Sequence, residues 1–342
     1  MPLCQNLKNR CQRIKTLRDR LVSVCEEAKT LDHQKLAELW KAKMELERER
    51  EELLNLIVPK KIETNWKNPE NQKEEKITIN FEEEIQSFQE FYQKHLQIEL
   101  NTKEIRSILR KHKKEIQKEM EQYGYDQILI IPENLPEEKE LNEKLIETMK
   151  EEVEENGEKK MKKVEETKYW ASQSTLVSAE KPKYRIILVH SDQNIYQNED
   201  ANPYLKATLG KNIPQLIFGI SDEKWEEIKS GGREEKYKQD AMKELEKGEI
   251  LDIHLEIQSQ KILIQAEGLS LREYEIFQRI FFEKHKKHLD VEGWTWLPKS
   301  CSGSRVVDVD WNPGLRRFHV DASVPSRRGA SLCLRLSRSF SN

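Results

Sequence analysis

The sequence predicts an α+β protein, with a helical N-terminal part and a small antiparallel sheet near the C-terminus. Two observations predict the class. Apolar residues at helical and heptad spacing fill much of the first 180 residues, whereas residues 305–337 alternate apolar and polar side chains, which is the period of a strand. Charged residues make up 35% of the chain and hydrophobic ones 36%, so we expect solvated helices beside a smaller core.

Residues 1–58 predict a helical hairpin or coiled coil. A seven-residue spacing relates Leu7, Ile14, Leu21 and Ala28. Asp32 can cap a second helix, which Pro59 ends. Two interpretations stay open: the helices form an oligomerisation arm and make the protein a homo-oligomer, or they simply pack against each other.

Residues 59–180 predict a mostly helical middle region with a short strand and linkers. The elements expected, in order, are a polar linker at 65–76, a helix opened by a capping box of Asn80 with Glu83, a helix from Thr102 to Tyr123 ended by Gly124, a buried strand at 126–132 and a charged helix with its exit at 137–168.

Residues 181–342 predict a second compact domain. The elements expected before its tail are a strand at 184–190, a short helix at 202–210, two charged helices around Gly231-Gly232, a hairpin of 250–257 with 261–267, and a helix opened by a capping box of Ser270 with Glu273.

The tail predicts three short strands, 306–312, 318–323 and 332–337, each with one buried and one solvated face. Alternation places Val307, Val309 and Trp311 inward, and Phe318, Val320 and Ala322 likewise. Their polar neighbours would point outward. On this pattern alone, an ordinary antiparallel sheet with a solvated outer side is the favoured interpretation.

The composition of the tail differs from that of the rest of the chain. From Ser300 to Asn342 there is no Lys, Glu, Gln, Met, Ile, Thr or Tyr, and all seven basic residues are Arg. Asp, Asn, His, Ser, Arg and Gly can all arise from an Asn codon by changes at its two adenines, whereas Lys, Glu, Gln, Met and Trp cannot. The alternative is a domain that simply has its own composition.

Residues 268–342, with the ending "LCLRLSRSF", resemble the variable proteins of diversity-generating retroelements, and the likeness extends more loosely back to about 181. The resemblance implies a C-type-lectin-like domain over 181–342, related in architecture to the formylglycine-generating enzymes. It also implies a reverse transcriptase that rewrites adenine positions in a variable region of about 305–331. Cys333 departs from the pattern, because Gly is usual there.

The function that this resemblance implies is binding of a variable ligand, expected to be a protein, through an exposed surface on a fixed scaffold. Changes at exposed positions typically alter stability by only about 0.5 kcal/mol, so such a scaffold tolerates them. The expected ligand-binding residues are Asp308, Asp310, Asn312, Leu315, Arg316, His319, Asp321, Ser323, Ser326, Arg328 and Gly329.

Three other functions are less well supported by the residues. An enzyme would need a catalytic motif, but there is no Gly-rich phosphate loop or H-E-x-x-H, and Cys301 and Cys333 match no known cysteine site. A calcium-dependent lectin would need an E-P-N motif to accompany "WNPG" (311–314), so no metal or other cofactor is expected. A fixed lectin-like or coiled-coil interaction adaptor remains the alternative.

Charge and cysteine content restrict partners and setting. The net charge is −3 without a dense basic stripe, so nucleic acid is not an expected partner. Five cysteines without C-x-x-C spacing argue against a zinc site or a disulfide framework. No membrane span or signal peptide is evident, which leaves the compartment unknown and makes cytoplasmic the default expectation.

Overall fold

The computed structural model describes two compact units, Met1–Pro59 and Lys60–Asn342. The residues that it describes are 11–19, 22, 37, 40–49, 60–148, 150–155, 158–163, 167–169, 176–178, 183–193, 195–248, 250–291 and 293–342. No helix among them is long and apolar enough to cross a membrane.

In the first unit, residues 11–19 and 40–49 are helical. Arg13 forms ion pairs with Glu45 at 3.2 Å and Glu49 at 3.1 Å, so the two helical segments contact each other within one chain. This contact favours the hairpin interpretation. Three of the four heptad positions lie outside the described residues, and oligomerisation through these helices stays a prediction.

The second unit contains all the named strands and eight named helices of the described residues. In chain order they are β1 (Lys61–Lys67), β2 (Glu74–Asn80), α3 (Phe81–Leu96), α4 (Thr102–Tyr123), β3 (Gln127–Ile131), α5 (Glu138–Thr148), β4 (Lys150–Glu155), β5 (Glu158–Lys163), β6 (Lys168–Tyr169), β7 (Leu176–Ser178), β8 (Arg185–Val189), α6 (Pro203–Lys206), α7 (Ile213–Phe218), α8 (Asp222–Ser230), α9 (Glu234–Glu246), β9 (Leu251–Ile257), β10 (Gln260–Ala266), α10 (Leu271–His285), β11 (Trp294–Ser302), β12 (Arg305–Asn312), β13 (Arg317–Ser323), β14 (Leu332–Leu334) and β15 (Arg338–Phe340).

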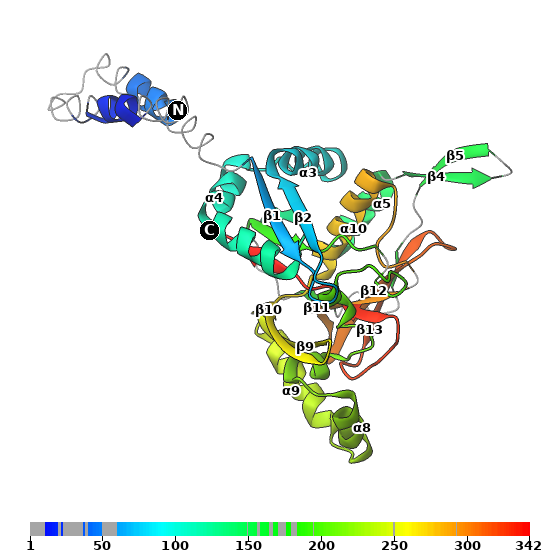
Figure 1. Cartoon of the computed structure of the whole chain (residues 1–342). Coiled ribbons are helices and arrows are strands. Elements are labelled where there is room, and N and C mark those ends of the chain that lie inside the picture. Colours follow the sequence, from blue (N-terminus) through cyan, green and yellow to red (C-terminus); the bar gives the residue numbers. More distant parts are fainter. Residues whose placement is uncertain are drawn as a thin grey trace. The chain divides into compact units, whose positions relative to one another are not determined.

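The stretch expected as a polar linker at 65–76 is instead a β-hairpin, β1–β2. Its apolar side chains are few but strictly alternate, with Ile62 and Trp66 buried on one face and polar side chains on the other. Because most residues of the solvated face are charged, the two-residue period of the strands was not recognised in the sequence. In Figure 1 the hairpin lies between α3 and α4.

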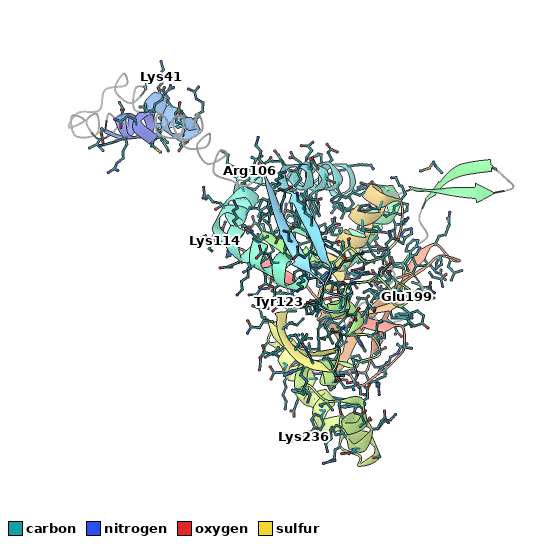
Figure 2. The ribbon with its side chains drawn as sticks, in the orientation of Figure 1. Lys41, Arg106, Lys114, Tyr123, Glu199 and Lys236 are labelled. Atoms are coloured by element: carbon teal, nitrogen blue, oxygen red, sulfur yellow. The ribbon has the colours of Figure 1, made fainter. Side chains whose placement is uncertain are left out.

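The two long helices after the hairpin are close to the prediction. Gly124 ends α4 with φ 76°, and a Cβ there would come within 2.7 Å of the Trp66 ring, so both conformation and space require glycine. Tyr123, the last residue of α4, is labelled in Figure 2. The capping box at Asn80 is wrong, because the Asn80 side chain makes no capping hydrogen bond.

The boundary expected near residue 181 does not separate two compact units. β3 and β15 both pair with β8, which follows that boundary, in a three-stranded antiparallel sheet of order β15-β8-β3. Every residue of β3 and of β8 is buried, including Arg185. The middle region therefore contributes a strand to the same core as the C-terminal strand. The division between Pro59 and Lys60 lies one residue from the boundary expected after residue 58.

Residues 137–168 differ from the expected charged helix and exit. α5 ends at Thr148, and β4 and β5 follow as an antiparallel hairpin. The sequence between the two strands is Asn156-Gly157, a dipeptide typical of two-residue hairpin loops, so a hairpin signal was present in the sequence.

Residues 184–285 follow the prediction closely. The expected helix pair appears as α8 and α9, and the expected hairpin as β9–β10. The second capping box is confirmed: the Ser270 hydroxyl accepts a hydrogen bond from the Glu273 amide, and the Glu273 carboxylate accepts one from the Ser270 amide.

The tail belongs to a six-stranded mixed sheet of order β14-β11-β12-β13-β6, in which β7 also pairs with β11. β12 and β13 agree with two predicted strands. The third, expected at 332–337, is shorter: β14 covers only Leu332–Leu334, and it pairs in parallel with β11, a strand that was not predicted. The α+β class with antiparallel pairing is confirmed, and the C-type-lectin-like fold stays a prediction.

Candidate functional site

The tail strands β12 and β13 form an antiparallel pair in which seven residues oppose seven. Opposed residues lie on the same face. Val309 opposes Val320, and Trp311 opposes Phe318, so these apolar side chains share one face. Asp308 opposes Asp321, and Asp310 opposes His319, so these polar side chains share the other.

The apolar face packs against α10. The Tyr274 ring lies 6.0 Å from the Phe318 ring in an edge contact, and the Arg279 guanidinium lies 4.9 Å from the centre of the same ring. Val307, Val309 and Val320 are fully buried. The inward set predicted from the alternation is therefore confirmed, and substitutions there would open cavities in the core.

The polar face is tied together by side-chain contacts that we call the Asp308 cluster, made of Asp308, Asp310, His319, Asp321, Ser323 and Arg327. Ser323 donates a hydrogen bond to the Asp308 carboxylate, and Arg327 donates one to Asp308 Oδ2 at 3.1 Å. Arg327 also lies 3.7 Å from Asp321 Oδ2. His319 Nδ1 lies 3.0 Å from Asp310 Oδ1.

This face is not solvated as predicted. Asp308 is 0% exposed, Asp310 7%, His319 5% and Ser323 5%, and only Asp321 among the five strand residues is half-buried. Alternation separates the two faces of a strand, but it does not say whether the second face is open to water. Here the second face carries its own buried polar contacts.

Burial shifts the pKa values of the cluster toward neutral forms. Burial raises the pKa of Asp308 to about 7, with the Asp321 charge adding to it and Arg327 opposing it. Burial, then the charges of Asp308 and Asp290, raise the pKa of Asp310 to about 7. Burial, then nearby Arg317 and Lys168, lower the pKa of His319.

Three predicted residues lie at the turn that joins β12 to β13. The Asn312 side chain accepts a hydrogen bond from the Leu315 amide at 2.9 Å, which closes the turn. Leu315 is 48% exposed, and Arg316 has φ 49°. Leu315 and Arg316 are at the hairpin tip, whereas Asn312 ends β12 and by the alternation of that strand lies on the face of the Asp308 cluster.

The other three predicted residues lie in the loop after β13. Arg328 binds Asp222 of α8 at 2.8 Å and Glu226 at 3.2 Å, so its side chain is directed to α8 and not to the Asp308 cluster. The Ser326 carbonyl accepts from the Asn212 side chain, and the Gly329 carbonyl from the Leu332 amide. The predicted set is thus divided among a strand face, a turn and an anchored loop.

Two residues of this region were missed. Arg327, not Arg328, reaches the polar face, and its guanidinium lies 5.6 Å from the centre of the Trp294 ring. Trp294 begins β11, and its ring stacks loosely on His319 at 6.5 Å. The alternation of "WTW" at 294–296 was an available strand signal, but the choice between two adjacent arginines required the loop conformation.

Within the described part of the chain, no group of three or more His, Cys, Asp or Glu side chains is arranged to hold a metal ion. Cys301 and Cys333 are both free thiols, and burial raises the pKa of Cys333 to about 12. A thiol with so high a pKa is a poor nucleophile near neutral pH.

Comparison with known protein families, with curated proteins and with solved structures finds no match to this chain. A functional assignment therefore rests on the residues and geometry of the site.

Proposed function

We propose that this chain is a ligand-binding protein whose variable surface is built from the β12–β13 hairpin and its loops, as in the variable proteins of diversity-generating retroelements. The observation that carries the proposal is the separation of the two faces of this hairpin. Polar residues that adenine changes can produce lie on one face, and the residues that pack on α10 lie on the other.

Exposure within the proposed surface is uneven, and this refines the proposal. The hairpin tip, with Leu315 and Asn312, offers the accessible part of the surface, whereas Asp308 and Asp310 form its buried polar floor. Leu315 is the apolar residue of this tip and is 48% exposed. Val324, 41% exposed after β13, is a second apolar residue of this kind.

The supporting scaffold lies directly behind the hairpin. Arg335, within the terminal "LCLRLSRSF", is 1% exposed and forms a two-pronged ion pair with Asp290, at 2.8 Å for each prong. The same Asp290 accepts hydrogen bonds from Tyr274 and Thr295. A binding surface on such a scaffold can change while the polar core stays fixed.

The decisive experiment is to sequence this locus and its neighbours in a population of the source organism. The proposal expects a near-copy of the tail region, adenines in that copy wherever the two differ, and a reverse transcriptase gene beside it. It also expects differences at Asp310, Asn312, Leu315 and His319 but not at Val309 or Arg335. A tail that varies no more than α4 does would contradict it.

The second candidate is a fixed lectin-like or coiled-coil interaction adaptor. The burial of Asp308, Asp310, His319 and Ser323 favours it, because buried and mutually bonded side chains are constrained by packing. The same population data separate the candidates, since an adaptor predicts even variation along the chain.

A further inference from the structure

The guanidinium of Arg327 lies among groups suited to a cation. Asp308 and Asp321 offer carboxylates, Ser323 offers a hydroxyl, and Trp294 offers an aromatic face. Carboxylates and aromatic faces together are the features by which proteins recognise guanidinium and ammonium groups. We call these four residues the cation site.

Arg327 is held loosely for a residue in such a position. Its side chain is 41% exposed, whereas that of Asp308 is 0% exposed. The contacts with Asp308, Asp321 and Ser323 are all made by one nitrogen, Nη1, so the two-pronged geometry available to arginine is unused. An exposed arginine that is held at one nitrogen loses little interaction free energy when its side chain moves away.

The same face carries a further buried carboxylate. Asp310 is 7% exposed, and its Oδ1 lies 3.0 Å from His319 Nδ1. Three aspartates of this face therefore meet one arginine and one histidine, so acidic groups outnumber basic ones around the cation site.

Resting on the proposed function, we infer that the cation site receives a lysine or arginine side chain of the protein ligand, and that Arg327 fills the site until the ligand displaces it. The exchange needs only rotation of the Arg327 side chain, because its backbone amide donates to Val324 within a local turn. A ligand arginine that uses two nitrogens could pair with both Asp308 and Asp321, the two carboxylates that Arg327 meets with Nη1 alone.

The test uses the full chain and two small probes, N-acetyl-arginine amide and its neutral isostere N-acetyl-citrulline amide. Binding is measured by the change in tryptophan fluorescence and by calorimetry. We expect Arg327→Ala to bind the arginine probe at least about tenfold more tightly than the unmodified chain, which is about 1.4 kcal/mol. The citrulline probe should bind to neither.

Two further variants assign the effect to the cation site. Adding Asp308→Asn to Arg327→Ala should weaken binding of the arginine probe about tenfold. Arg305→Ala removes a tail arginine that donates to the Ala322 carbonyl and lies outside the cation site, and this variant should behave as the unmodified chain does. Arg327→Gln serves if Arg327→Ala unfolds, because it keeps most of the side-chain stem.

Equal binding of the probe by the unmodified chain and by Arg327→Ala would overturn the inference, as would binding that Asp308→Asn leaves unchanged. Tight binding of free arginine with no binding of an arginine-containing peptide would assign the site to a small cation, against a protein ligand. Population sequencing is independent of this result: variation confined to the tail together with a failed probe leaves the proposed function standing and removes only the cation site.

Discussion

Two buried polar clusters lie on opposite faces of the same sheet, and they are built differently. The first, which we call the Arg335 cluster, consists of Arg335, Asp290, Tyr274 and Thr295. Its carboxylate meets a two-pronged guanidinium and two hydroxyl donors, and Arg335 donates further to the His190 and Asp192 carbonyls. Every charge there is compensated by a partner in fixed geometry.

The Asp308 cluster contains more acid than base and holds its base weakly. Three aspartates face one arginine that is 41% exposed, and His319 is kept toward its neutral form. A fully hydrogen-bonded polar network makes a core rigid. A partly bonded network lowers the stability of the fold, because its unpaired buried groups have lost their contacts with water. Burial alone therefore does not separate a structural cluster from a proposed binding cluster. The degree to which the buried charges are paired separates them.

The largest expected effect comes from breaking the Arg335 cluster. Arg335→Ala leaves Asp290 as a buried carboxylate without its counter-charge, and such a loss typically costs about 3–5 kcal/mol. We expect the chain to unfold at much lower denaturant concentration or to fail to accumulate as folded protein. Arg327→Ala is the matched control: it also leaves a buried carboxylate, Asp308, but the Asp308 pKa of about 7 lets that group bind a proton, so the expected cost is smaller, about 1–2 kcal/mol. Equal losses for the two variants would contradict the comparison.

The second prediction concerns pH. Asp308 and Asp310 have folded-state pKa values of about 7, above the value of roughly 3.9 for an unfolded chain. Each therefore binds a proton more readily when folded, so its contribution to stability is fully present below about pH 4 and is lost as the pH rises through about 7. At about 1.4 kcal/mol per pH unit, we expect the free energy of unfolding to fall by about 2–3 kcal/mol for each of the two aspartates between pH 5 and pH 8.

The double variant Asp308→Asn/Asp310→Asn should remove most of this decline, because asparagine does not ionise. The measurement is urea unfolding at several pH values. A decline as steep in the double variant as in the unmodified chain would assign the pH dependence to other groups and remove the distinction between the clusters.

The smallest expected effect lies at the hairpin tip. Leu315→Ser removes an exposed side chain that is outside both clusters, and its effect on the free energy of unfolding should stay within about 0.5 kcal/mol. Val309→Ala on the apolar face of the same hairpin is the control, with an expected loss of about 1–3 kcal/mol from the cavity it leaves. Thermal unfolding of the two variants measures the difference directly.

The sequence by itself determined the local structure wherever a signal was complete within a few residues. The αL position at Gly124, the capping box of Ser270 with Glu273 and the strand period of 306–312 were all predicted and confirmed. Each depends on hydrogen bonds or side-chain directions set within one turn or one strand.

The tertiary structure decided which strands pair with one another and which side chains come into contact. β8 joins β3 across the expected boundary, β11 enters between β12 and β14, and Arg328 turns to α8 while Arg327 covers Asp308. Pairing partners lie far apart in the chain, and a period of two gives the faces of a strand without giving what covers them. The alternation in the tail therefore separated its core face from its polar face. Only the tertiary structure shows that the polar face is buried and that Arg327 contacts Asp308 on it.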